Sequence, residues 1–184
     1  MFVKISLLTP ALSSLREARE KNGTGVKMCR NQQIKTIMSL HTPDLTKQPP
    51  RSPRVRLGGY VILPRCLDKG RAEIAGKNGD YHYACPLDQQ FLTFAGIDPK
   101  ALKKELKKSD TEVLEWINAH AKHKRTAPEI AAWTAWQEQR APDNPDSREF
   151  FNSLHKSGAP KRTDIVTWFD ALDLDDYVSF GGKA

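Results

Sequence analysis

Residues 63–74, LPRCLDKGRAEI, are the stretch from which the fold class follows. Pro64 suits the first turn of a helix, where the missing N–H leaves no hydrogen bond unmade. One face of such a helix carries Leu63, Leu67, Gly70 and Ile74. The opposite face carries Arg65, Asp68, Lys69 and Ala72. This division into an apolar and a charged face predicts a helix over 63–74.

Signals for helix starts recur after this segment. They are Cys85-Pro86, Asp98-Pro99, Asn144-Pro145, and the capping boxes Ser109–Glu112 and Thr126–Glu129. Thr163-Asp164 predicts the start of the last helix, and the alternation in 80–84 predicts a brief extended piece. The tryptophans have the spacing of core residues: Trp116, Trp133, Trp136 and Trp168. We therefore expect an all-α, compact single-domain bundle of about six short helices.

The segment before the first helix is rich in proline and arginine. Residues 41–56, HTPDLTKQPPRSPRVR, contain four prolines and three arginines, which predicts an extended arm. Residues 1–37 form a basic extension, interpreted as disordered or as a wrongly assigned start. Translation would then begin at Met1, Met28 or Met38. The helical domain is expected over 38–180, with a short tail over 181–184.

The net charge of +7 is unevenly distributed along the chain. Residues 1–37 carry seven basic and two acidic residues, whereas the other 147 residues carry 22 basic and 20 acidic ones. A nucleic-acid-binding domain usually carries its positive excess on the folded part. The charge distribution therefore makes nucleic-acid binding the weakest of the functions considered.

Cysteine use and hydropathy indicate the cellular compartment. The three cysteines, Cys29, Cys66 and Cys85, form no plausible disulfide framework, and no CxxC pair encodes a zinc ribbon. No apolar run approaches the length of a membrane span. The sequence therefore predicts a soluble protein of a reducing compartment, the cytoplasm, that has no membrane partner.

A group of basic residues around the first helix is the main candidate site. It consists of Arg51, Arg54, Arg65, Lys69 and Arg71, with Asp68 among them. Guanidinium groups bind phosphate and carboxylate in a bidentate manner, which predicts a pocket for a small anion. The alternative is structural: Arg65 and Asp68 would form an i,i+3 ion pair, and the other arginines would be solvated or would fix the arm to the bundle.

Tyr81 and Cys85 complete the candidate ligand-binding residues. Cys85 precedes a helix start, where the helix dipole favours a thiolate, and His82 lies three residues before it as a conceivable base. The alternative is that Cys85 is a small buried residue at a helix cap. No metal site is expected: His120 and His123 lie at the basic end of a helix, without an acidic partner at metal-motif spacing.

Three stretches of the chain resemble a bacterial family described as domain of unknown function 5069. They are RSPRVRLGGYVILPRCLDKGRA at 51–72, YHYACPLD at 81–88 and FLTFAGID at 91–98. The resemblance covers roughly residues 43–180, which supports Met38 as the start of the domain. It implies the limits of the domain and transfers no role to any residue.

These observations lead to one principal expectation about function and two alternatives. The principal one is a domain that binds a small anionic metabolite, or acts on it as an enzyme, without a cofactor. The first alternative is a non-catalytic protein-interaction module, or a homo-oligomer, in which the arginine-rich arm contacts an acidic surface. The weaker alternative is nucleic-acid binding by the basic extension and the lysine-rich segment 100–108.

Overall fold

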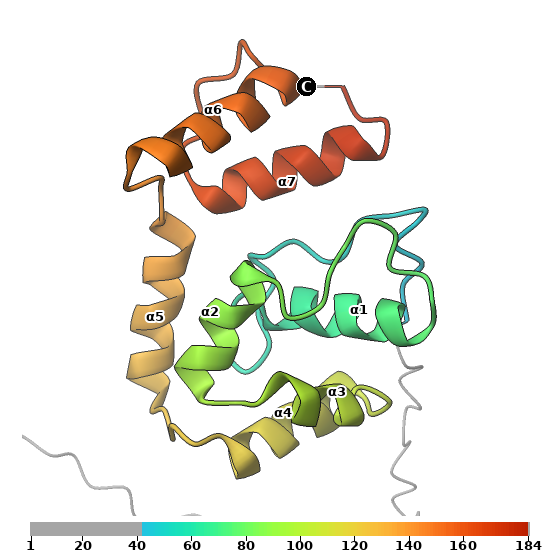
Figure 1. Cartoon of the computed structure of the whole chain (residues 1–184). Coiled ribbons are helices and arrows are strands. Elements are labelled where there is room, and N and C mark those ends of the chain that lie inside the picture. The colour runs from blue at the N-terminus through green and yellow to red at the C-terminus, as the bar shows by residue number, and fades with distance from the viewer. Residues whose placement is uncertain (1–41, 184) are drawn as a thin grey trace, which may run out of the picture. The chain divides into compact units, whose positions relative to one another are not determined.

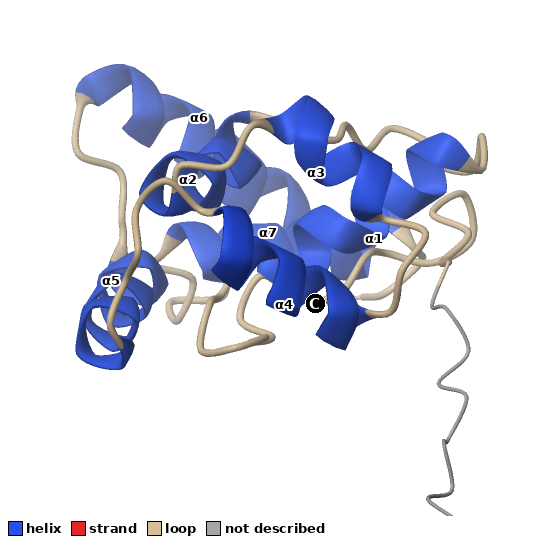
Figure 2. Ribbon diagram, turned by 90° about the horizontal axis from the view of Figure 1, so that it is seen from below, coloured by secondary structure: helices blue, strands red, loops and turns tan. Residues whose placement is uncertain are grey.

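The computed structural model describes residues 42–183, which contain seven α-helices and no strand. The helices are α1 (Leu63–Ile74), α2 (Pro86–Ala95), α3 (Pro99–Glu105), α4 (Asp110–His120), α5 (Ala127–Gln139), α6 (Pro145–Gly158) and α7 (Trp168–Ser179). Figure 2 shows helices joined by loops throughout this range. The prediction of an all-α fold is confirmed, with one helix more than the approximate number expected.

The predicted capping signals mark most of the helix starts. Ser109, Thr126 and Asn144 each accept a hydrogen bond from a backbone N–H of the first turn, and each capping box is complete. Asp98 caps α3 by accepting from the Ala101 N–H at 2.8 Å. These side chains satisfy N–H groups that have no partner inside the helix, so each start is fixed by local chemistry.

Two local predictions are wrong. The last helix begins after Thr167 rather than at Thr163-Asp164, because Thr167 and Asp170 form the capping box. Asp164 instead forms an ion pair with Arg162. Residues 80–84 contain turns rather than an extended piece, and Ala84 has a positive φ of 57°.

Helix α1 is buried along almost its whole length. Every residue from Leu63 to Ala72 is buried, including the charged ones. Its apolar residues Leu63 and Leu67 belong to the main core, together with residues of α2, α3, α4 and α7. Gly70 gives the closest approach, because a Cβ added there would lie 2.2 Å from the Leu106 Cδ1 atom. The charged side chains of α1 therefore face other parts of the protein.

A second, smaller core joins α6 to α7, which lie side by side in Figure 1. Its buried residues are Phe151, Ala159, Ile165, Ala171 and Leu174. Phe169 of α7 belongs to the main core instead, so α7 contacts both groups of buried residues. This position places the acidic face of α7 against the segment that precedes α1.

Residues 42–62 run past α1 without forming a helix. The Leu45 N–H donates to the Lys77 carbonyl at 2.8 Å, and the Ile62 N–H donates to the Pro53 carbonyl at 2.9 Å. The first bond holds the segment against the turn that follows α1, and the second closes a loop within the segment. The predictions for residues 1–37, Met28 and Met38 lie outside the described residues. Within residues 42–183, no helix has the length and apolarity needed to cross a membrane.

The tryptophans divide between core and surface. Trp133 stacks on Phe94 at a centroid distance of 4.6 Å and packs against the main core, as predicted. Trp136 is 57% exposed, so its predicted core position is wrong. Because the buried residues of α5 are Thr134 and Gln137, helical spacing places Trp136 away from the core.

We predict that Gly70→Ala destabilises the protein by about 1–2 kcal/mol, although alanine favours helices by up to about 1 kcal/mol. The added Cβ would lie 2.9 Å from Tyr83 and, as the main cause, 2.2 Å from Leu106. Shortening that neighbour should relieve it, so Gly70→Ala and Leu106→Val should be coupled by at least about 0.5 kcal/mol. Urea unfolding of both single variants and the double variant measures the coupling. Strictly additive losses would contradict the close packing.

Candidate functional site

A pocket of about 660 Å³ lies beside α1. Its walls come from the turn at 45–46, from α1, from segment 79–87 and from the C-terminal part of α7. The lining residues used below are Arg65, Lys69, Tyr81, His82, Cys85 and Asp175. Four of the eight predicted ligand-binding residues therefore share this pocket: Arg65, Lys69, Tyr81 and Cys85.

Lys69 is the buried cation next to α2. Its side chain is 3% exposed, and its Nζ lies 2.8 Å from the Asp88 Oδ1 atom. The same ammonium group donates to the Cys85 Sγ at 3.1 Å. Burial alone would lower the pKa of Lys69, but the Asp88 carboxylate outweighs burial and raises that pKa. Lys69 therefore stays charged at the edge of the pocket.

Arg65 is the buried cation next to α7. Its two terminal nitrogens donate to the two carboxylate oxygens of Asp176 at 2.6 and 3.0 Å. The guanidinium lies over the Tyr81 ring at 5.5 Å, and the Tyr81 hydroxyl donates to Asp176 at 2.7 Å. The Arg65 Nε is buried and has no hydrogen-bond partner in the described part of the chain. Arg65 lines the pocket and thus keeps one unsatisfied donor within its buried guanidinium.

Cys85 is half-buried at the N-cap of α2 and lines the pocket. The residue before it, Ala84, has a left-handed φ, a conformation that costs a non-glycine residue about 1–3 kcal/mol. Cys66 differs from Cys85 because it is fully buried in α1, and burial raises the pKa of its thiol well above the ordinary value. Of these two thiols, only Cys85 is open to the pocket.

Three other predicted residues belong to a separate, partly buried network. Arg51 binds both oxygens of Asp68 at 2.8 and 2.7 Å. Arg51 also donates to Asp110 at 2.6 Å, and Arg71 donates to the other oxygen of Asp110 at 2.6 Å. Asp68 therefore pairs with Arg51, and Arg65 pairs with Asp176, instead of forming the i,i+3 pair considered from the sequence. The network joins α1 to α4 and does not line the pocket.

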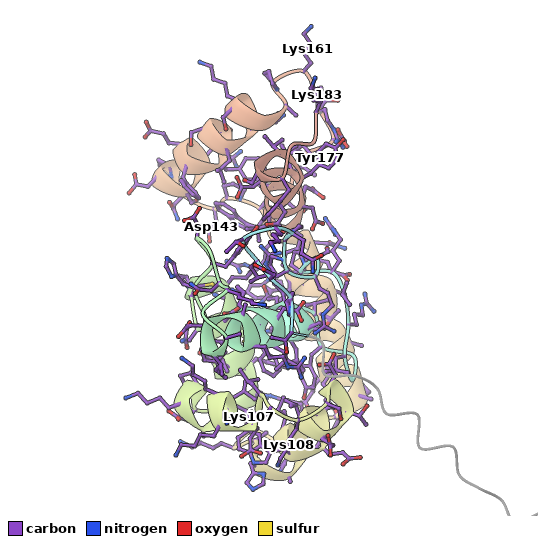
Figure 3. The ribbon with its side chains drawn as sticks, turned by 90° about the vertical axis from the view of Figure 1, so that its right-hand side faces the viewer. Lys107, Lys108, Asp143, Lys161, Tyr177 and Lys183 are labelled. Atoms are coloured by element: carbon purple, nitrogen blue, oxygen red, sulfur yellow. The ribbon has the colours of Figure 1, made fainter. Side chains whose placement is uncertain are left out.

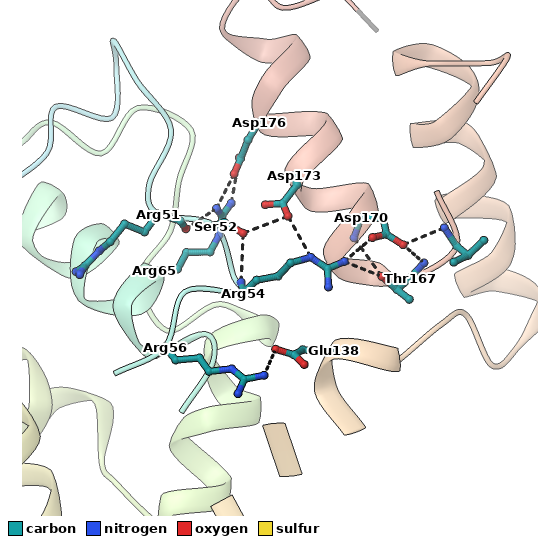
Figure 4. A network of polar contacts seen from close by, with 11 residues as sticks. Arg51, Ser52, Arg54, Arg56, Arg65, Glu138, Thr167, Asp170, Asp173 and Asp176 are labelled. Carbon is teal, nitrogen blue, oxygen red and sulfur yellow. Dashed lines mark hydrogen bonds and ion pairs between the residues drawn. The ribbon is translucent and has the colours of Figure 1, made fainter. Parts of the chain in front are cut away.

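The remaining arginines of the arm contact α7 and α5. Figure 4 shows Arg54 extended along α7 toward Asp170 and Asp173, while Arg56 reaches Glu138 at 2.7 Å. Ser52 donates to Asp173 at 3.1 Å. Arg54 is not among the lining residues of the pocket. These arginines fix the arm against two helices.

Sequence reasoning missed the contribution of α7 to the site. Asp175 and Ser179 line the pocket from this helix, and Asp176 binds Arg65. A signal was present in LDLDD at 172–176, the densest acidic stretch in the chain. Its negative charge is complementary to the positive charge of the arginine-rich arm. No local rule relates two segments more than a hundred residues apart, so the pairing could not be derived.

The lysine-rich segment forms α3 and its end, away from the pocket. Lys100, Lys103, Lys104 and Lys107 surround Ile74 in a shallow depression. Figure 3 shows Lys107 and Lys108 near α3 and α4, and Lys161 and Lys183 near α6 and α7. The His120 ring stacks on Trp116 at a centroid distance of 4.7 Å, and residues 42–183 contain no group of three or more side chains placed to hold a metal ion.

We predict that Asp110→Asn costs about 2 kcal/mol of unfolding free energy at pH 7, the usual effect of losing charge-assisted hydrogen bonds. Partial burial alone would raise the pKa of Asp110, but Arg51 and Arg71 outweigh it and lower that pKa. The stabilisation is therefore complete above the unfolded-state pKa of about 4 and is lost as pH falls through the folded-state pKa.

Denaturant unfolding at several pH values measures this effect. The difference between wild type and Asp110→Asn should shrink as the pH falls below about 4. Glu149→Gln is the control, because Glu149 is an exposed carboxylate of α6. A difference for Asp110→Asn that stays constant with pH would contradict the ion pairs described here.

Comparison with known proteins identifies a family for this chain. A search of curated proteins finds no match. The family model described as domain of unknown function (DUF5069) matches residues 47–178, which include all seven helices except the last residue of α7. The match covers the pocket lining from Arg65 to Asp175 and the arginine-rich arm from residue 51 onward. The chain therefore belongs to the DUF5069 family.

Proposed function

We propose that this protein binds a small anionic molecule in the pocket beside α1. The observation that supports the proposal is that two buried cations, Arg65 and Lys69, line the same pocket. Both remain charged against carboxylates that are themselves buried, Asp176 and Asp88. A pocket of about 660 Å³ is within the range typical of small-molecule sites.

Hydrogen-bonding capacity favours an anion over a neutral ligand. The Arg65 Nε has no partner among the described residues. The Lys69 ammonium carries three N–H donors; one donates to Cys85, and the group forms an ion pair with Asp88. The start of α2 adds further N–H groups beside Cys85 and Leu87. These donors would serve a carboxylate or a phosphate better than an uncharged group.

The pocket lining also indicates the rest of the ligand. Leu45, Leu87, Leu172 and Phe180 add apolar surface to the wall. Such a wall suits a ligand in which an anionic group is joined to an apolar body. Asp175 and Ser179 are exposed at the α7 side of the pocket. A substitution that removes or adds a charge at these positions therefore leaves the core undisturbed.

We predict that one compound from a panel of carboxylates, phosphates and nucleotides stabilises the protein. At a concentration of 100 times its Kd, the ligand adds about 2.7 kcal/mol, which for a chain of this size raises Tm by about 5–10 °C. Asp175→Asn should tighten binding and Ser179→Asp should weaken it, each by about threefold at low salt. Thermal unfolding and calorimetric titration measure these effects.

The control for these charge variants is Asp143→Asn. Asp143 is exposed in the connection from α5 to α6, and Figure 3 labels it away from Tyr177 and Lys183 at the end of α7. This variant changes the net charge as Asp175→Asn does, but outside the pocket lining. Equal effects of the two variants, or a panel without any stabilising compound, would refute the pocket proposal.

A second candidate function is a protein-interaction module, with support from exposed apolar side chains. Trp136, Phe150 and Val166 are each more than half exposed and lie on or between α5, α6 and α7. The arginine-rich arm supports this function less, because its arginines already pair with Asp110, Asp170 and Glu138. Nucleic-acid binding has the least support, because residues 38–184 carry nearly equal numbers of basic and acidic residues, 22 and 20.

The free thiols support a reducing compartment such as the cytoplasm. Cys66 and Cys85 are both unpaired, and Cys66 lies in the core of the protein. A half-buried thiol that contacts an ammonium group would be open to oxidation in an oxidising compartment. We therefore propose that the protein resides in the cytoplasm.

A further inference from the structure

The contact between Cys85 and Lys69 points to covalent chemistry in the pocket. A thiol is a nucleophile in its thiolate form, which nearby cations and helix N-termini favour. Cys85 has both features, since it stands at the N-cap of the ten-residue helix α2 and accepts from the Lys69 ammonium at 3.1 Å. Asp88 holds that ammonium in place from the other side at 2.8 Å.

We propose that Cys85 is a nucleophile that takes an acyl group from an activated acyl compound bound in the pocket, with Lys69 as the cation that supports the reaction and Asp88 as a positioning residue. The inference rests on the proposed function, because the anionic part of the compound would occupy the same pocket. It adds the reaction class, acyl transfer, and the residue that forms the bond.

The surroundings of Cys85 distinguish it from a structural cysteine. Cys66 is fully buried beside Asp88 and does not line the pocket, so no bound compound can reach its thiol. Cys85 is half-buried, lines the pocket and contacts a buried cation. The strained backbone of Ala84 directly before it fixes the direction from which the chain enters α2. Strain of this kind gathers at functional sites.

The reaction proceeds in two balanced steps. The Cys85 thiolate attacks the carbonyl carbon of a thioester or an acyl phosphate, an S–C bond forms, and the bond to the leaving group breaks. The leaving group departs with the electron pair as a thiolate or a phosphate and needs no proton. Water then cleaves the new thioester and yields a carboxylic acid and the free Cys85 thiol.

The pocket residues match the charges that develop in these steps. The Lys69 ammonium lies beside the sulfur and can stabilise negative charge on the carbonyl oxygen or on the leaving group. Arg65 adds a second cation to the same lining. His82 is exposed and also lines the pocket, where it supplies a group able to accept the proton released by water.

The experiment treats the full chain with p-nitrophenyl acetate and follows the release of p-nitrophenolate. We expect a burst equal in amount to the protein, with the acetyl group on the peptide that contains Cys85. The peptides that contain Cys29 and Cys66 are the internal references. Cys85→Ser should abolish the burst. The pair Lys69→Met with Asp88→Asn should slow acylation about tenfold, the effect of losing one charge-assisted hydrogen bond.

The same chain unfolded in urea gives the intrinsic reactivity of the Cys85 thiol and does not depend on the folding of any variant. Acylation of Cys85 that is no faster in the folded protein than in urea would overturn the inference. The double variant removes both buried charges together, so neither remains unpaired, and circular dichroism checks its fold.

The outcomes separate this inference from the proposed function. If an anion stabilises both the wild type and Cys85→Ser but Cys85 is not acylated, the inference is wrong and the proposed function stands. If Cys85 is acylated rapidly but no anion stabilises the protein, the nucleophile stands and the anion proposal is wrong. Alkylation by iodoacetate against iodoacetamide gives a direct comparison, and a faster reaction with the charged reagent supports both.

Discussion

The structure depends on one requirement: four charged side chains of α1 are buried, so each needs a partner of opposite charge. Asp68 binds Arg51 of the arm, Arg65 binds Asp176 of α7, Lys69 binds Asp88 of α2, and Arg71 binds Asp110 of α4. A buried charge without a partner would cost several kcal/mol. Four segments are therefore held to one short helix by electrostatic necessity as well as by apolar packing.

This arrangement also explains where the pocket lies. Arg65 and Lys69 are one helical turn apart on α1, and each is fixed by a carboxylate on a different helix. Segment 79–87 passes between these two contacts and brings Tyr81 and Cys85 to the same space. Thus Arg65 and Lys69, which hold α7 and α2 to α1, also form part of the polar lining of the pocket. A ligand bound there would lie next to both ion pairs.

The sequence predicted the local structure well because helix starts are local. The cap residues and prolines gave six of the seven helix starts, and the bounds 63–74 of α1 agree with the structure. The prediction for the start of α7 was wrong because Thr163-Asp164 and Thr167–Asp170 both have the composition of a cap. Only the second pair leads into the helix. The prediction for Trp136 was wrong because a tryptophan was expected to be buried. Thr134 and Gln137 instead occupy the buried side of α5.

The candidate site was predictable only in part. Arg65 with Lys69, and Tyr81 with Cys85, are close in sequence, and all four line one pocket. The pairing of Arg51, Arg54 and Arg71 with Asp68, Asp110 and Asp170 depends on contacts between distant segments. Charge composition showed that the folded part is nearly balanced but gave no information on which charges meet.

The most direct test of the account is an arginine side-chain ¹H–¹⁵N spectrum recorded during titration with the stabilising anion. Arg65 and Arg71 are both buried, but the Nε of Arg71 donates to the Leu106 carbonyl at 3.0 Å, whereas the Nε of Arg65 has no partner among residues 42–183. The account predicts that the Arg65 signals shift to saturation while the Arg71 signals stay in place. Arg65 signals that do not move when the protein is saturated, or equal shifts of both arginines, would contradict it.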